Sequence, residues 1–417
     1  MFLLSMSWAA LVHGSLRTRR SLSVSIPSEI HYEWIATNHD LQEFVQFAMQ
    51  TSEYYLDTEF HREKTYYPQL ALIQIASGDR IAVIDPISAD AKLLRPLFEG
   101  PYMCILHAGQ QDLDVLTQSL GMIPSQMLDT QLCAGFIGYS QPSLASLLQA
   151  KLKIDVPKGD RLTDWLRRPL TKDQLRYAAS DVAFLAELSK LIFDELEARG
   201  RMQWARDACE ELRTRPTGPH APHDAWLRVK DVRTLKGKSR WVAQAVAHWR
   251  EERAMDLDLP PRHVLSDIAI LGVAQRTPRT TDDLLQSRGV DNRHANGAQG
   301  RAILEAISEG IKNSANGDLP FPSSDGDDVD KSLRPAATLV SAWITELARQ
   351  SDLDAGLLGT RKDITDLLNK SDSARLRHGW RAEIVGNDIE DLVAGRKALT
   401  FSPDNGAGLR LVAIQES

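Results

Sequence analysis

The segment that most constrains the fold of this chain is residues 53–84, in which three strand-like runs follow one another closely. Residues 53–60, 70–76 and 80–84 have the length and the aliphatic and aromatic content of β-strands. The residues at 77–79, Ser-Gly-Asp, are a turn signal between the last two runs. Because short turns join strands that run in opposite directions, the segment predicts an antiparallel β-meander.

Beyond the meander, short apolar runs alternate with helical periodicity. Residues 103–107 have the pattern of a buried strand, and residues 127–130 that of another short strand. Thr171 begins a capping-box signature, and apolar positions recur at helical spacing from there to Leu196, which predicts one long helix. Strands followed by alternating helices and strands predict an α/β domain with a mixed sheet flanked by helices.

Two carboxylates lie on the first strand of the meander. Because side chains alternate between the faces of a strand, Asp57 and Glu59 point to one face and Thr58 points to the other. Adjacent acids on a core strand repel each other and are costly to desolvate, unless a cation neutralises them. Oxygen ligands favour hard cations such as Mg²⁺ or Mn²⁺. The alternative is an edge strand with two solvated acids.

Three residues downstream can complete a cation site. Asp112 begins a predicted helix, and Tyr177 and Asp181 share one face of the long helix. Two divalent cations about 3.5–4 Å apart need carboxylates from several elements, and Asp57 beside Glu59 is the natural bridge between them. Tyr177 could then hold an attacking water. Taken singly, Tyr177 could also be a packing residue, Asp181 a solvated acid and Asp112 a partner of the helix dipole.

The combination and order of these residues resemble the ribonuclease D family, within the DEDD group of 3′→5′ exonucleases. The motifs that carry the resemblance are LDTEF at 56–60, extended through residue 70, HAGQQDL at 107–113, RLTDWL at 161–166 and YAASDV at 177–182. The similar region covers residues 35–198.

This resemblance implies an RNase H-like fold and two-metal hydrolysis of RNA from its 3′ end, which releases nucleoside 5′-monophosphates. In the family pattern Asp57, Glu59, Asp112 and Asp181 bind two divalent cations, Mg²⁺ or Mn²⁺, and Tyr177 orients the water. Precursors of tRNA are the substrate that the resemblance implies. A 3′→5′ DNA exonuclease and a catalytically silent nucleic-acid-binding scaffold are the alternatives, since nothing in the motifs reads the 2′-hydroxyl group.

At 417 residues the chain is too long for a single core. Residues 247–254 and 259–271 are similar to HRDC domains, and a second helical segment of similar length follows. The expected organisation is a disordered N-terminal extension (1–30), an exonuclease domain (31–212), a linker (213–223), an HRDC domain (224–312), a second linker (313–335) and a second, all-α HRDC-like bundle (336–417).

Further candidates for contact with RNA lie outside the carboxylates. His61, Tyr66, Tyr67 and Gln69 follow the first strand and could touch phosphate or stack on terminal bases, or could simply pack or be solvated. The first helical bundle offers basic residues near tryptophans, which suit phosphate contact and stacking or else form a solvated face: Arg228, Lys230, Lys236, Lys238 and Arg240. Asp129 and Asp164 are candidates for helix caps or for support of the ligands.

Composition limits the other possibilities. Hydrophobic content of 43% and charged content of 25% are typical of a soluble globular protein, and the net charge of −7 weakly opposes nucleic-acid binding. The three cysteines form no C-x-x-C pair, which predicts buried thiols in a reducing compartment, the cytoplasm. Val232 replaces the first glycine of a P-loop, so no nucleotide cofactor is expected. We also expect a monomer.

The N-terminal segment offers no membrane anchor. Its apolar run at 2–12 is too short to span a bilayer, which needs about 20 residues. Residues 1–27 contain no acidic side chain. An organelle transit peptide and a start codon assigned too far upstream are therefore alternatives to a disordered extension.

Overall fold

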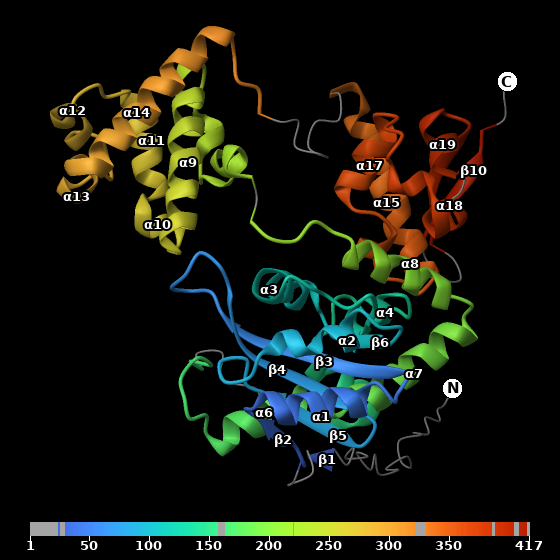
Figure 1. Cartoon of the computed structure of the whole chain (residues 1–417). Helices are drawn as coiled ribbons and strands as arrows, with labels where there is room; N and C mark the ends of the chain where they lie inside the picture. Colours follow the sequence, from blue (N-terminus) through green and yellow to red (C-terminus); the bar gives the residue numbers. More distant parts are fainter. Residues whose placement is uncertain are drawn as a thin grey trace, which may run out of the picture.

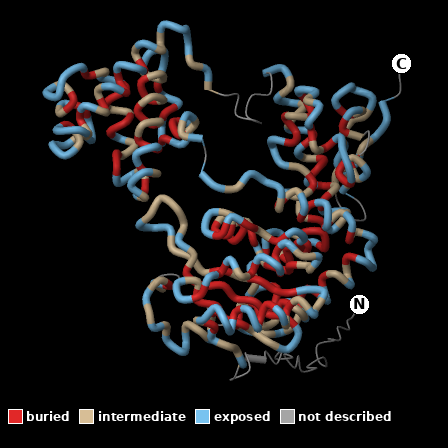
Figure 2. The backbone as a smooth tube through the Cα atoms, in the orientation of Figure 1, coloured by how far each residue is buried: buried red, intermediate tan, exposed pale blue. Residues whose placement is uncertain are grey.

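The computed structural model describes residues 24–25, 30–156, 163–219, 221–321, 331–385, 388–403 and 408–414. It contains one domain built on a β-sheet and two helical bundles, which lie above the sheet in the view of Figure 1. Figure 2 shows a buried interior in each of these three parts. In the described ranges, no helix is both long and apolar enough to cross a membrane.

The central sheet has six strands in the order β2-β5-β4-β3-β6-β7. Their bounds are Glu33–Ile35 (β2), Glu53–His61 (β3), Gln69–Ser77 (β4), Arg80–Ile84 (β5), Met103–Leu106 (β6) and Gln126–Asp129 (β7). Strands β3, β4 and β5 are antiparallel, whereas β6 and β7 continue in parallel from β3 and β2 is parallel to β5. The predicted meander and the mixed sheet are both confirmed.

Helices cover both faces of this sheet. One face, which carries Leu56 and Ile73, shares an apolar core with α1 (Asn38–Ala48), α2 (Arg95–Phe98) and α3 (Gln110–Leu120). The opposite face, which carries Leu72 and Val83, packs against α6 (Lys172–Ala183). Because Asp57 and Glu59 alternate with Leu56 along β3, they belong to the face that α6 covers.

The single long helix predicted from Thr171 to Leu196 is wrong. The structure has two helices, α6 and α7 (Leu185–Ala198), separated at Phe184, whose φ of −116° and ψ of 7° are not helical. The break lets each helix bury its own face: Ala178 and Ala179 of α6 lie over the meander, whereas Leu188 of α7 joins a core shared with the second bundle. Helical periodicity alone does not reveal a one-residue change of direction.

The remaining elements of this domain are short, apart from α8, which leads toward the bundles. They are η1 (Ala91–Leu94), α4 (Thr130–Gly135), α5 (Leu144–Leu147), η2 (Leu148–Leu152), β8 (Ile154–Asp155) and α8 (Met202–Arg213). Strand β8 pairs in parallel with β1 (Val24–Ser25), so these two residues of the extension predicted to be disordered are paired. The rest of that extension up to residue 29 lies outside the described residues, as do Arg161 and Leu162 of the RLTDWL motif.

The first bundle has a core of its own, centred on Trp226 and Val242. Its elements are η3 (Pro222–Arg228), η4 (Val232–Thr234), α9 (Lys238–Leu257), α10 (Pro261–Val264), α11 (Asp267–Arg276), α12 (Thr281–Leu285), α13 (Asn292–Ala295), α14 (Gly297–Asn313) and η5 (Ser314–Asn316). The 3₁₀ segment η4 ends at Thr234, and α9 begins after Gly237, whose φ of +50° is a conformation that glycine adopts readily.

The second bundle shares one apolar core with the sheet domain. Its elements are η6 (Lys331–Leu333), α15 (Arg334–Gln350), α16 (Ala355–Leu358), α17 (Arg361–Leu368), η7 (Arg375–Arg377), α18 (Gly379–Val385) and α19 (Asp388–Val393). Trp380 stacks on Trp204 of α8, with ring centroids 5.7 Å apart. The backbone N–H of Asp354 donates to Gly135 in α4 at 2.8 Å. This bundle therefore packs as one body with the sheet domain.

The second bundle is not all-α as predicted. It ends in an antiparallel hairpin of β9 (Lys397–Ser402) and β10 (Gly408–Ala413). Leu399 and Leu411 pack at the edge of the shared core. Elsewhere the prediction of helices is confirmed. Cys104, Cys133 and Cys209 are buried free thiols, as expected.

Candidate active site

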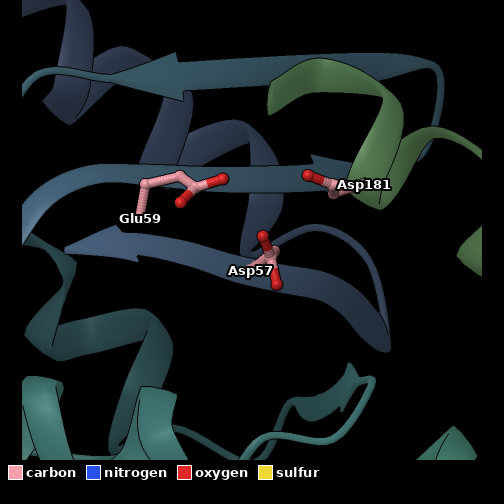
Figure 3. A group of neighbouring side chains, drawn as sticks. All are labelled: Asp57, Glu59 and Asp181. Atoms are coloured by element: carbon pink, nitrogen blue, oxygen red, sulfur yellow. The ribbon is translucent and has the colours of Figure 1, made fainter. Parts of the chain in front are cut away.

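The carboxylates of Asp57, Glu59 and Asp181 come together between β3 and α6. One oxygen from each lies within 4.8 Å of the others. Figure 3 shows Glu59 and Asp181 pointing toward each other, with the Asp57 carboxylate beside them. The alternation of β3 places the first two side chains, and α6 supplies the third from above the same face. Two of the three therefore come from one strand, and the third comes from a helix about 120 residues later in the chain.

Asp112 approaches the same site from α3, where it lies in the first helical turn. It is buried, and the Thr58 hydroxyl donates a hydrogen bond to its Oδ1. Asp112 is not among the three carboxylates that meet within 4.8 Å. Its charge nevertheless acts on both Asp57 and Glu59, so it lies at the edge of the cluster. The structure thus brings all four predicted ligands into one neighbourhood, three of them in direct proximity.

Asp129 holds the start of α3 in place. Its carboxylate accepts hydrogen bonds from the backbone N–H groups of Ala108 and Gly109 at 3.0 and 2.9 Å. It also caps α4 by accepting from Gln131 and Leu132. Ala108 has a φ of +58°, and these bonds stabilise that turn. The prediction that Asp129 is a cap is confirmed, and through the turn it sets the direction of α3.

Burial and mutual repulsion make the cluster difficult to ionise in the absence of a cation. Burial raises the pKa of Glu59 to about 8, and the charges of Asp181 and Asp112 add to the effect. Burial raises the pKa of Asp181 to about 7 and that of Asp112 to about 6. Burial raises the pKa of Asp57 well above its ordinary value, and the charges of Asp112, Asp181 and Glu59 raise it further. A divalent cation would remove this penalty, because it favours the charged form of every ligand.

Tyr177 faces the cluster from the same helix as Asp181. Burial raises the pKa of its hydroxyl, as do the neighbouring charges of Asp181, Glu59 and Asp57. Its ring stacks on Trp165 with centroids 6.0 Å apart, which fixes the side chain. The hydroxyl therefore stays protonated at neutral pH and is a hydrogen-bond donor beside the carboxylates, where it interacts with Asp181.

Two candidates for RNA contact instead join the sheet domain to the first bundle. The Tyr66 hydroxyl donates to Glu251 of α9 at 2.7 Å, and Arg228 donates to the same carboxylate at 2.6 Å. Asp258, at the end of α9, accepts from the backbone N–H groups of Tyr66 and Tyr67 at 3.0 Å each. These bonds engage the Tyr66 hydroxyl in the contact between the two domains, while Arg228 bonds the same carboxylate from within the first bundle.

The other candidates for RNA contact differ in their exposure and in their hydrogen bonds. Arg240 is engaged within the bundle, since it donates to the carbonyls of Leu235 and Leu319 and lies over the Phe321 ring. His61 continues the face of Asp57 and Glu59, and its buried Nε2 has no hydrogen-bond partner among the described residues. The remaining candidates are exposed: Gln69, Lys230, Lys236 and Lys238. Asp164 accepts from the backbone N–H of Leu166 in a local turn.

Two residues beside the carboxylate cluster, Thr58 and Gln74, are not among the residues predicted from the sequence. Thr58 lies between the two acids of β3 and bonds Asp112 from the opposite face of the strand. Gln74 is the single polar residue in the apolar run of β4 and stands directly opposite Asp57. A polar residue inside an apolar strand was the available signal, because such a residue is rarely buried without a partner.

Comparison with known families agrees with this geometry. Residues 32–197 match a family described as 3′-5′ exonuclease, and residues 239–307 match the HRDC domain. These ranges contain the carboxylate cluster and the core of the first bundle. The predicted exonuclease and HRDC folds are confirmed.

The similarity extends over most of the chain in individual relatives. A ribonuclease D from Acidiphilium cryptum is 33% identical over 356 residues, which cover 82% of this chain and 88% of that protein. The ribonuclease D of Escherichia coli is 30% identical over 374 residues, covering 87% and 99% respectively. The crystal structure of Escherichia coli RNase D, described as an exoribonuclease involved in structured RNA processing, superimposes with a TM-score of 0.78 at 29% identity and covers 88% of this chain and 99% of that one.

Proposed function

Because this chain belongs to the ribonuclease D family, we propose that the carboxylate cluster between β3 and α6 is the active site of a 3′→5′ exoribonuclease. The activity and the RNA substrate follow from the family and confirm the expectation from the sequence. The assignment of particular residues is our proposal. The observation that supports it is the meeting of Asp57, Glu59 and Asp181 within 4.8 Å, with Asp112 at their edge.

The donor set fits divalent cations, which the exonuclease domain and its acidic cluster support. All candidate ligands are carboxylates, which favour hard ions, and we propose two ions of Mg²⁺ or Mn²⁺. Asp57 is the candidate bridge, since its carboxylate lies near those of both Glu59 and Asp181, and the charges of Asp112, Asp181 and Glu59 all raise its pKa. When bound, such a pair of ions stabilises the attacking and leaving oxygens of an in-line displacement at phosphorus.

The protein side chains orient the attacking water and the carboxylates. Tyr177 donates its hydroxyl hydrogen bond toward the attacking water, and the stacking on Trp165 keeps the donor in place. The 3′-terminal phosphodiester then breaks on the side of the 3′ oxygen, which releases a nucleoside 5′-monophosphate. Thr58 orients Asp112 by its hydrogen bond and contacts no reacting atom in this scheme.

The RNA substrate that we propose is a tRNA precursor. The relative from Escherichia coli is described as acting in structured RNA processing, and a structured tRNA body with a trailing 3′ end fits that description. The exonuclease domain (31–212) would cut, while the HRDC domain (224–312) and the second bundle (336–417) would hold the folded part of the RNA. The exposed Lys230, Lys236 and Lys238 are candidate phosphate contacts.

We further propose a monomer that needs no nucleotide cofactor and works in the cytoplasm. The three buried free thiols are consistent with a reducing compartment. The N-terminal 30 residues have no role in this proposal. None of these statements affects the assignment of the site.

The test is degradation of one RNA labelled at its 3′ end or at its 5′ end. With Mg²⁺ or Mn²⁺, the 3′ label should appear at once as a mononucleotide while the 5′ label shortens stepwise; EDTA should stop both. A DNA of the same sequence tests the alternative substrate, and faster loss of DNA than of RNA would contradict the proposal.

A further inference from the structure

Gln74 is buried beside the carboxylate cluster without any hydrogen bond. It has 0% exposure, and neither Nε2 nor Oε1 of its side-chain amide has a hydrogen-bond partner among the described residues. An amide in this state is unfavourable, because it has lost its bonds to water and gained none in return. Buried polar groups in proteins are nearly always bonded, so an exception calls for an explanation.

The register of the sheet places Gln74 next to Asp57. The two residues are direct partners in the antiparallel pairing of β3 and β4, so their side chains project from the same face. Directly opposite residues have Cβ atoms about 4.5–5.5 Å apart, which the combined reach of a glutamine and an aspartate spans. On its other side Gln74 pairs with Val83, which offers no polar group. Asp57 is the polar side chain that the strand pairing sets opposite Gln74.

The layer above Gln74 is apolar as well. Leu72 and Val83 of the same face pack with Ala178 and Ala179 of α6, which closes this part of the sheet from solvent. Water therefore has little access to Gln74, and the polar groups next to it on the sheet are those of the carboxylate cluster. A carboxylate that binds a cation commonly has its orientation fixed by a hydrogen bond from a neighbouring side chain.

We propose that Gln74 is a positioning residue of the cation site, and that its amide N–H donates to the Asp57 carboxylate when cations are bound. This inference rests on the proposed function of the cluster. In this role the amide fixes the orientation of Asp57, and the carbonyl end of Gln74 remains toward the apolar layer. This hydrogen bond satisfies the N–H end of the amide, which otherwise has no partner among the described residues.

The experiment is a titration of the metal-free full chain with Mn²⁺ by calorimetry, together with urea unfolding in EDTA. Gln74→Met keeps the size of the side chain and removes the amide. We expect Mn²⁺ to bind about 10–100-fold more weakly, with no fall in the urea midpoint in EDTA. Excess Mn²⁺ should restore RNA cleavage in this variant, which a loss of packing would not allow.

Val83→Ala is the matched control. It opens a small cavity next to Gln74 in the same layer, so it should lower the urea midpoint and leave the Mn²⁺ affinity unchanged. Unchanged Mn²⁺ affinity in Gln74→Met would overturn the inference. A loss of Mn²⁺ affinity in Gln74→Met together with a fall in its urea midpoint in EDTA would also overturn the inference. The amide would then have a structural role, for example through a bond to a trapped water.

Two further variants complete the design. Gln74→Asn keeps the amide but withdraws it by one methylene, so it should also weaken Mn²⁺ binding; wild-type affinity there would contradict the proposal even if Gln74→Met failed to fold. Asp57→Asn separates this inference from the proposed function. If Asp57→Asn binds Mn²⁺ normally, the site itself is misassigned. If Asp57→Asn loses Mn²⁺ binding while Gln74→Met keeps it, only the role of Gln74 is refuted.

Discussion

Asp258 accepts a hydrogen bond from the backbone N–H of Tyr66, a residue 192 positions earlier in the chain. The bond joins the end of α9 in the first bundle to the loop that follows β3, the strand of Asp57 and Glu59. A second contact, from the Tyr66 hydroxyl to Glu251, lies beside it. The position of the first bundle is therefore connected to the segment that leaves the active site.

Asp258→Gly should loosen this contact without unfolding the bundle. Asp258 has a φ of +49°, which glycine adopts freely, so the change removes the acceptor with little backbone strain. We expect cleavage of a short single-stranded RNA to stay near wild type and cleavage of a tRNA precursor to fall several-fold. Small-angle X-ray scattering of this variant should show a broader distribution of distances within the molecule. The exposed Asp256→Ala on the same helix is the control, and an identical effect in both variants would contradict a specific contact.

Asp112→Asn should reduce the rate of RNA cleavage by on the order of 10³-fold or more, because one ligand charge of the cation site is lost. The asparagine oxygen can still accept from Thr58, so the fold should be preserved. Asp114→Asn, two positions along the same helix and outside the cluster, is the matched control and should keep wild-type activity. Equal activity of the two variants would remove Asp112 from the site.

Tyr177→Phe should lower the maximal rate by about 10²–10⁴-fold, the range for groups that assist proton transfer or orient a nucleophile. The ring would keep its stacking on Trp165, so Mn²⁺ affinity should not change. Tyr55→Phe is the control, since it removes a hydroxyl on the same sheet that bonds Glu53 rather than the cluster. A normal rate in Tyr177→Phe would leave the tyrosine with a packing role only.

The cation-free protein should become less stable as the pH rises. The folded-state pKa values of Glu59 and Asp181, about 8 and 7, lie above the ordinary values of 4.5 and 3.8. Protonation of these two groups therefore stabilises the folded state. Their contribution to the free energy of unfolding is complete below about pH 4 and is lost as the pH rises through about 8. Urea unfolding in EDTA between pH 5 and 8.5, about the range of these shifts, measures the effect.

Bound cations should remove most of this pH dependence, because they stabilise the ionised carboxylates. Cation binding near pH 7 should therefore release protons, which calorimetry in buffers of different ionisation enthalpy detects. An equally steep loss of stability with pH in saturating Mn²⁺ would contradict the cluster as the binding site. Glu59→Gln should show a shallower dependence in EDTA.

Glu211→Gln should destabilise the contact between α8 and the second bundle by about 1–3 kcal/mol, because the buried Arg381 loses its charged partner. Arg375 bonds the same carboxylate. Thermal or urea unfolding measures the loss. Glu210→Gln, whose partner Arg213 is on the same helix surface, should change the stability by less than about 1 kcal/mol. Similar losses in both would argue against a shared core.

The parts of the site that follow local periodicity were predictable from the sequence. Strand alternation places Asp57 and Glu59 together, and helical spacing places Tyr177 near Asp181. Thr58 and Gln74 were missed because their roles depend on what lies across the sheet, and that depends on register. The contact of Tyr66 with Asp258 joins two domains, and no local pattern encodes such a pairing.

The elements of the fold also divide into those that follow local sequence patterns and those that depend on tertiary packing. The meander and the mixed sheet follow from apolar runs and turns, whereas the break at Phe184 changes the direction of a helix without changing its periodicity. The terminal hairpin near Leu399 and Leu411 is short and half exposed, so its apolar pattern is weak. Trp380 enters the core of the sheet domain only through tertiary packing.

The most direct test of the account is anomalous X-ray scattering from crystals of the full chain soaked in Mn²⁺. We expect two peaks between β3 and α6, both within about 2–2.3 Å of a carboxylate oxygen and both bound by Asp57. Peaks elsewhere, with none within reach of Asp57 and Asp181, would contradict it.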